Sequence, residues 1–165
     1  MNEDLVLKTF ENDEAVLAAV NEAFGGLPRP DKFTAEDGDP ECMLHDEMWH
    51  RVTPETISIE DVFPELSFPY NELLSEGVAY YLPAITRLVL ADDRTEDWSG
   101  VPFVDGVLCR LKPEDCSGKR ANVVLGVMRY IIDHKSHQID DPEEVANLEK
   151  VILRWQESIG SSNAS

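Results

Sequence analysis

The clearest structural pattern in this chain lies near its C-terminus, where residues 142–159 carry apolar side chains at helical spacing. The apolar positions step by three and four and form one stripe: Val145, Leu148, Ile152, Trp155 and Ile159. Asp141 can cap this helix, Pro142 suits its first position, and Glu144 completes a capping box. Because the stripe needs an apolar partner, we expect this helix to pack against other helices.

Four further segments have helical signals, and they span residues 13–24, 40–51, 76–91 and 117–135. The candidate capping residues are Asn12, Asp39, Ser75 and Ser117. The segment 76–91 is the most hydrophobic, and we expect it to lie at the centre, between 117–135 and 142–159. It contains Pro83, which removes one helical hydrogen bond, so the sequence predicts a kink there or a junction of two helices.

The remaining segments are rich in Pro, Gly and Asp and are expected to form long ordered loops. Residues 101–111 also allow a small hairpin around Asp105 and Gly106. The chain of 165 residues suits one domain. We therefore predict a mainly α, single-domain bundle of about five helices over residues 1–165, with flexible ends at 1–12 and 160–165.

The chain is strongly acidic, with 33 Asp and Glu against 14 Lys and Arg and a net charge of −19. Residues 1–66 hold 17 acids and 4 bases, residues 67–116 hold 9 and 4, and residues 117–165 hold 7 and 6. Such a charge disfavours binding to nucleic acids and to anionic membranes, both of which need clustered Lys and Arg. It favours a basic protein partner for the part of the chain before residue 117.

The start of the chain lacks the pattern of a signal peptide, and no apolar stretch has the length of a membrane span. The three cysteines, Cys42, Cys109 and Cys116, are an odd number without an export signal, which is typical of reduced thiols in a cytoplasm. The expected location is therefore cytoplasmic. No phosphate-binding loop, dinucleotide motif or serine-hydrolase elbow is present, so we expect no cofactor.

The strongest chemical cluster is the segment 41–50, in which Cys42, His45, Glu47 and His50 are metal-ligand types. His45 and His50 are five residues apart, about 140° around a helix, so they do not share a face. Glu47 and His50 form one E-x-x-H pair, whereas di-iron bundles need a second pair. The favoured interpretation is an acidic helix with two surface histidines. A metal site or an enzyme built on these residues is the alternative.

The segment Ser75–Ala84 contains Tyr80, Tyr81, Leu82 and Pro83. Adjacent helical residues point about 100° apart, so one tyrosine can enter the core while the other reaches a surface or a loop. Core packing with a hydroxyl hydrogen bond is the favoured role.

This segment, with Leu66-Ser67-Phe68 before it, resembles a family of small bacterial proteins classed as a domain of unknown function. That family carries an E-G-(aromatic)-x-Y-Y-L-P-A helix, and Val78 stands here in place of the usual aromatic residue. Glu41-Cys42 with His45-Asp46, and Lys112-Pro113-Glu114, resemble its flanking elements. The resemblance covers residues 13–135 and implies a mostly helical bacterial fold without a known activity.

The sequence thus predicts a non-catalytic protein-interaction module, such as an adaptor or an immunity protein. Its acidic part would meet a basic partner. Self-association through the nearly neutral C-terminal helix is a further possibility.

Overall fold

The computed structural model describes residues 8–35, 39–65, 67–112, 116 and 118–163. Helices dominate this part of the chain, and the single pairing of extended residues within it is an isolated bridge between Thr34 and Leu73. The prediction of a mainly α, single-domain fold is confirmed. In chain order the elements are α1 (Asp13–Phe24), α2 (Pro40–Arg51), α3 (Ile59–Val62), the 3₁₀-helix η1 (Pro69–Glu72), α4 (Ser75–Ala91), α5 (Gly100–Pro102), the π-helical turn η2 (Phe103–Val107), the 3₁₀-helix η3 (Leu108–Arg110), α6 (Gly118–Lys135), the 3₁₀-turn η5 (Ser136–Gln138) and α7 (Pro142–Asn163).

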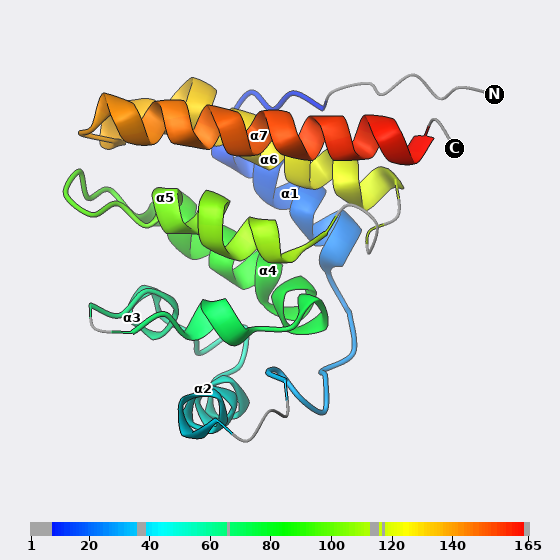
Figure 1. Ribbon diagram of the computed structural model, residues 1–165, viewed down its shortest axis with the longest axis vertical. Coiled ribbons are helices and arrows are strands. Elements are labelled where there is room, and N and C mark those ends of the chain that lie inside the picture. Colours follow the sequence, from blue (N-terminus) through cyan, green and yellow to red (C-terminus); the bar gives the residue numbers. More distant parts are fainter. Residues whose placement is uncertain (1–7, 36–38, 66, 113–115, 117, 164–165) are drawn as a thin grey trace.

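The layers are built around α1, which packs against both α4 and α6, while α6 packs against α7. Figure 1 shows α6 and α7 at one end of the long axis and α2 at the opposite end. The expectation that α4 lies between α6 and α7 is therefore wrong. Four residues of the apolar stripe of α7 are buried in the core and at most 5% exposed: Leu148, Ile152, Trp155 and Ile159.

The helix α4 runs without interruption through Pro83, so the predicted junction of two helices is wrong. It begins with Ser75 as its first helical residue, and Leu74 takes the capping position without a side-chain hydrogen bond. Nine buried residues cover most of its length, and this burial outweighs the one hydrogen bond that proline removes. The candidate cap Ser117 of α6 lies outside the described residues.

The hairpin expected within residues 101–111 does not form, because residues 100–110 make the successive helical turns α5, η2 and η3. The buried residues Phe103, Val104, Val107 and Leu108 are spaced as on one face of a helix. That pattern outweighs the turn signal of Asp105 and Gly106. The lack of a side chain at Gly106 serves close packing, since an added Cβ would lie 2.5 Å from the ring of Tyr70.

Of the two ends expected to be flexible, residues 1–7 and 164–165 lie outside the described residues. Phe10 packs against the core, and α7 continues through Asn163. Within the described part of these two segments, apolar contact at one end and helix propagation at the other order the chain. Among the described helices, none combines the length and the apolar character that crossing a bilayer requires.

Candidate functional site

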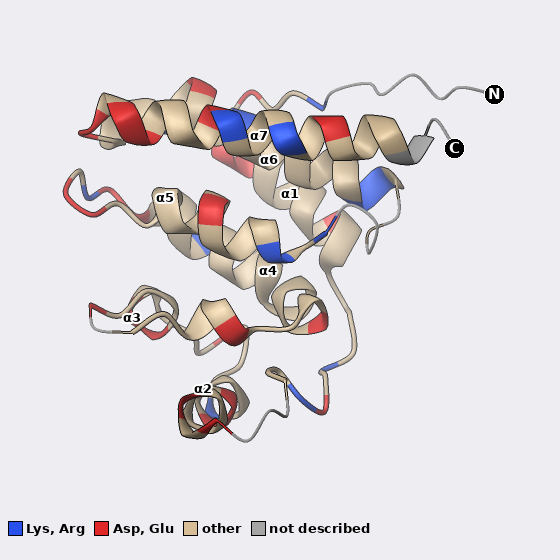
Figure 2. Cartoon of the chain, viewed as in Figure 1, with Lys and Arg blue, Asp and Glu red and all other residues tan. Residues whose placement is uncertain are grey.

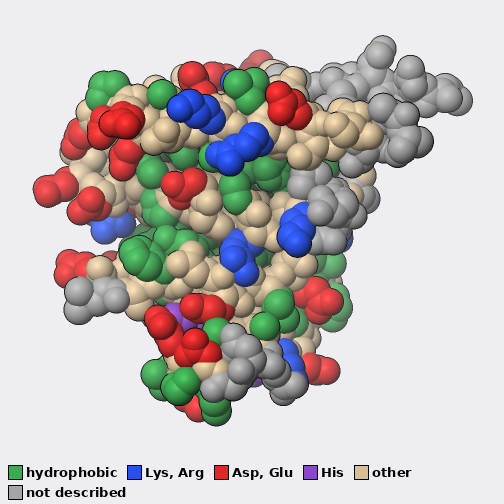
Figure 3. Space-filling view, in the orientation of Figure 1, with side chains coloured by type: hydrophobic (Ala, Val, Ile, Leu, Met, Phe, Trp, Pro, Cys, Tyr) green, Lys and Arg blue, Asp and Glu red, His purple; other side chains and the backbone are tan. Residues whose placement is uncertain are grey.

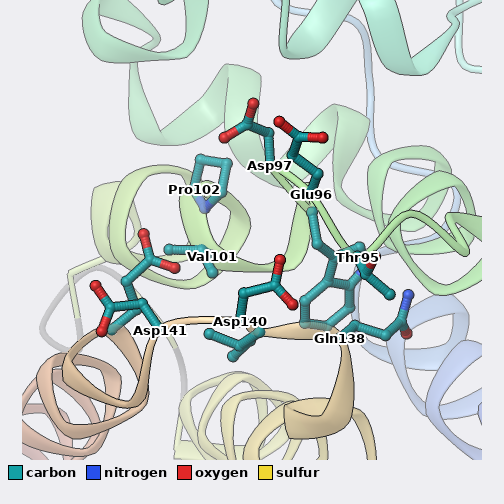
Figure 4. A pocket seen from close by; sticks show the side chains of 11 residues that line it. Thr95, Glu96, Asp97, Val101, Pro102, Gln138, Asp140 and Asp141 are labelled. Atoms are coloured by element: carbon teal, nitrogen blue, oxygen red, sulfur yellow. The ribbon is translucent and has the colours of Figure 1, made fainter.

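An acidic pocket of about 300 Å³ lies between the loop that precedes α5 and the start of α7 (Figure 4). Its apolar floor consists of Trp98, Val101, Pro102 and Ile139. Five acidic residues line the pocket on its two sides: Glu96, Asp97, Asp140, Asp141 and Glu144. Among the described residues that line the pocket, none is basic. The pocket therefore combines an apolar surface with a concentrated negative charge.

The loop on one side of this pocket is organised by Asp92, whose side chain is only 6% exposed. Its carboxylate accepts hydrogen bonds from Nε of Arg94 at 2.8 Å and from Oγ of Ser99 at 2.6 Å. Its backbone carbonyl accepts from the indole of Trp98 at 3.1 Å and from the amide of Gln138 at 2.8 Å. Since Gln138 belongs to the opposite wall, Asp92 joins the two walls and fixes the width of the pocket.

These contacts also change the acidity of the site. Burial by itself would raise the pKa of Asp92, but the hydrogen bonds from Arg94 and Ser99 outweigh burial and hold that pKa well below its usual value. The guanidinium of Arg94 pairs with Asp92 and not with the carboxylates of the pocket. Beside the pocket, burial and then the charge of Glu144 raise the pKa of Asp105. The negative charge of Glu144 thus reaches a neighbouring carboxyl group outside the pocket lining.

The sequence did not reveal this pocket. Charge totals placed almost all of the excess acid before residue 117, yet three of the five carboxylates come from the C-terminal third. Figure 2 shows acidic residues both in the loop before α5 and at the start of α7, and Figure 3 shows acidic side chains gathered on that side of the molecule. The local signal for this pocket was the acidic run Asp140-Asp141-Pro142-Glu143-Glu144. Helix capping explains only Asp141, whose Oδ1 accepts a hydrogen bond from the backbone of Glu143 at 2.9 Å.

A second group of side chains, of the types that bind metal ions, lies at the other end of the molecule, on α2 and η1. His45 is 9% exposed, and its Nδ1 contacts Oε2 of Glu72. Glu41 lies one turn before His45 on α2. The ligand-type atoms of these three residues all lie within 4.8 Å of one another, and Figure 3 shows a histidine bordered by acidic side chains at this end.

The structure does not bring together the four residues that the sequence singled out on this helix. His50 is exposed and points elsewhere, with Nε2 at 3.0 Å from the carbonyl oxygen of Asp31. Glu47 is exposed and lines an open depression with His50, while Cys42 is buried. The expectation of two surface histidines is thus wrong for His45, whose burial depends on η1 and has no local signal.

An enzyme using His45, Glu47 and His50 would need all three in one enclosed pocket. The structure instead places His45 against Glu72, and Glu47 with His50 at an open surface. Sequence reasoning missed Glu72, which is 27 residues from His45. It could have found Glu41, because the spacing E-x-x-x-H puts two ligand types on one helix face.

Cys109 lacks the lowered pKa that a nucleophilic thiol needs. None of the three cysteines forms a disulfide bond. The thiol of Cys109 donates to the carbonyl of Val104 at 3.2 Å, and burial, followed by the charge of Asp105, raises its pKa to about 11. A thiol with so high a pKa is almost entirely protonated at neutral pH and reacts slowly.

The two adjacent tyrosines of α4 differ in burial, as expected for helical residues that point about 100° apart. Tyr81 is fully buried, whereas Tyr80 is half-buried and packs edge-on against it, with ring centroids 4.9 Å apart. The hydroxyl of Tyr81 lies 2.6 Å from the carbonyl oxygen of Trp49. The Tyr-Tyr-Leu-Pro segment therefore holds α2 on the bundle, with Leu82 buried and Pro83 half-buried beside it.

Comparisons of the chain with protein-family models, with curated proteins and with solved structures found no match. The resemblance to the small bacterial family stays a prediction. The functional interpretation below therefore depends on the geometry and charge of the two groups just described.

Proposed function

We propose that this protein is a non-catalytic interaction module, of the adaptor or immunity type, that receives a basic partner protein at the acidic pocket. The observation that carries the proposal is that five carboxylates and several apolar side chains line the same pocket. A Lys or Arg side chain has an apolar stem and a charged head, so its stem would lie on Trp98 and its head among the carboxylates. The net charge of −19 would speed the encounter with such a partner.

A cytoplasmic location belongs to the same proposal and is supported by three cysteines that form no disulfide bond. A bacterial origin is supported by the resemblance of the α4 segment alone. Self-association through α7 is also kept as a proposal. It would have to use the outer face, where Leu153 is 51% exposed, because the apolar stripe is buried within the chain.

Affinity capture from a bacterial extract tests the proposed function. The bait is compared with a pocket variant that carries Glu96→Gln, Asp97→Asn and Asp140→Asn. Asp97 has a backbone φ of 50°, which Asn also tolerates, and Asp141 is left intact because it caps α7. A matched control carries Glu11→Gln, Glu149→Gln and Glu157→Gln, which remove the same charge at exposed positions outside the pocket.

We expect a basic protein that the wild type and the control capture and that the pocket variant captures about tenfold less, since complementary charges mainly set association rate and specificity. Raising the salt from about 0.05 to about 0.5 M should release it, because screening lengths shorten at high ionic strength. Capture that is equal for both variants, or that salt does not affect, would contradict the proposal.

A further inference from the structure

The buried contact between His45 and Glu72 joins two elements that are already fixed by other bonds. The indole of Trp49, on α2, donates to the carbonyl of Pro69, the first residue of η1, at 3.2 Å. Trp49 is fully buried, so this bond is shielded from water. The imidazole and the carboxylate are therefore held face to face by the fold and not only by their mutual attraction.

Glu41 adds a second carboxylate to this pair. It is four residues before His45 on α2, which places the two side chains about 40° apart around the helix. The side chain of His45 is 11% exposed and that of Glu72 is 26% exposed, whereas Glu41 lies at the surface. The two carboxylates therefore flank one buried imidazole, and this set of side chains can offer three ligand atoms to a cation.

We propose that Glu41, His45 and Glu72 form a binding site for a divalent transition-metal ion, with zinc as the best fit. One imidazole and two carboxylates are ligands that zinc accepts, and three protein ligands leave a fourth position for water. Ligand atoms at about 2.0–2.2 Å from a tetrahedral ion lie roughly 3.4 Å from one another. The ligand atoms of the three residues now lie up to 4.8 Å apart, so binding an ion requires small movements of their side chains. The ligand atoms of His45 and Glu72 are in direct contact and must separate to admit the ion, and the partly exposed carboxylate of Glu72 and the exposed side chain of Glu41 supply the movement.

The ion would take the place of the direct contact between His45 and Glu72. It would also connect α2 to η1 at the end of the molecule opposite α7. This site is independent of the acidic pocket and of the proposed partner.

The test uses the full chain, free of any histidine tag, equilibrated with zinc, desalted and analysed by mass spectrometry for bound metal. Affinity is then measured by competition with a chromophoric chelator. We expect one zinc per chain, and affinities about tenfold or more weaker for Glu72→Gln and for Glu41→Gln. The variant Glu47→Gln, on the same helix and outside the group, should bind as the wild type does.

Circular dichroism of each variant shows whether the fold is kept, and Gln at position 72 can still accept a hydrogen bond from His45. Cys42→Ala excludes a thiolate ligand and should leave the affinity unchanged. The proposal is overturned if the wild type retains much less than one zinc per chain. It is also overturned if Glu47→Gln weakens binding as much as Glu72→Gln, or if Cys42→Ala abolishes it.

Discussion

The hydroxyl of Tyr81 lies 2.6 Å from the carbonyl oxygen of Trp49 and thereby joins the middle of α4 to the end of α2. The rings of these two residues also pack together, with centroids 5.1 Å apart. The same hydroxyl is 2.7 Å from the carbonyl of Val52, and its single hydrogen can point to only one of the two carbonyls at a time. Arg29 also donates to these carbonyls, at 3.4 Å, so the end of α2 has donors from two sides.

Tyr81→Phe should destabilise the protein by about 1 kcal/mol, because it removes a buried donor while keeping the ring. Urea denaturation measures the change in the free energy of unfolding. Tyr80→Phe is the matched control, since among the described residues the hydroxyl of Tyr80 makes no hydrogen bond. A loss in the control equal to that of Tyr81→Phe would mean that the hydroxyl bond is not the cause.

Stability should also fall at alkaline pH. Burial raises the pKa of Tyr81 to about 12, and burial together with the hydrogen bond to Asp13 raises that of Tyr130 to about 12. In the unfolded chain a tyrosine titrates near pH 10. Because the folded-state pKa values are higher, their contribution is complete below about pH 10 and is lost as the pH rises towards 12.

Urea midpoints measured at intervals between about pH 8 and 11.5 test this expectation. The variants Tyr81→Phe and Tyr130→Phe should each lose less stability over this range than the wild type does. If all three proteins respond equally to pH, these two hydroxyls do not control the alkaline transition.

Asp92→Asn should cost about 2 kcal/mol, in the range measured for hydrogen bonds to charged groups, because the carboxylate accepts from both Arg94 and Ser99. The pKa of Asp92 is held below its usual value in the folded state. Its contribution is therefore present above about pH 4 and is lost as the pH falls further. The variant should accordingly show a weaker loss of stability in acid than the wild type.

Asp93→Asn is the control, since Asp93 is the exposed neighbour of Asp92. Thermal unfolding followed at about pH 7 and about pH 3 gives both comparisons. Equal losses at positions 92 and 93 at neutral pH would show that the bonds around Asp92 do not hold the loop.

Gly100→Ala should destabilise the floor of the acidic pocket. A Cβ at this position would lie 2.2 Å from the ring of Trp98, which is 3% exposed and cannot move away freely. Overpacking of this kind costs about 1–3 kcal/mol. Gly160→Ala is the control, because a Cβ there meets nothing within 4 Å and alanine favours the helix.

Urea denaturation of both variants should give opposite signs. Gly100→Ala is expected to lower the free energy of unfolding, and Gly160→Ala to leave it unchanged or raise it slightly. A neutral Gly100→Ala would mean that the indole has space to move, and that the pocket floor is less rigid than its burial indicates.

Local signals in the sequence were sufficient to predict two helices, α1 and α2, to the residue. The bounds of α1 follow from Asn12, whose side chain accepts from the backbone of Ala15, and from Gly25 after its end. Those of α2 follow from Asp39 and Pro40. Such caps and periodic apolar positions act within one or two helical turns, so the sequence alone determines them.

The tertiary structure decided what lies beyond that range. Residues 100–110 became helical because their buried positions face the core, although they contain a turn signal. The acidic pocket joins residues 96–97 to residues 140–144, and the candidate metal site joins Glu41 and His45 to Glu72. No local pattern connects segments 27 or more residues apart, because only the packing of whole helices sets which of their side chains meet.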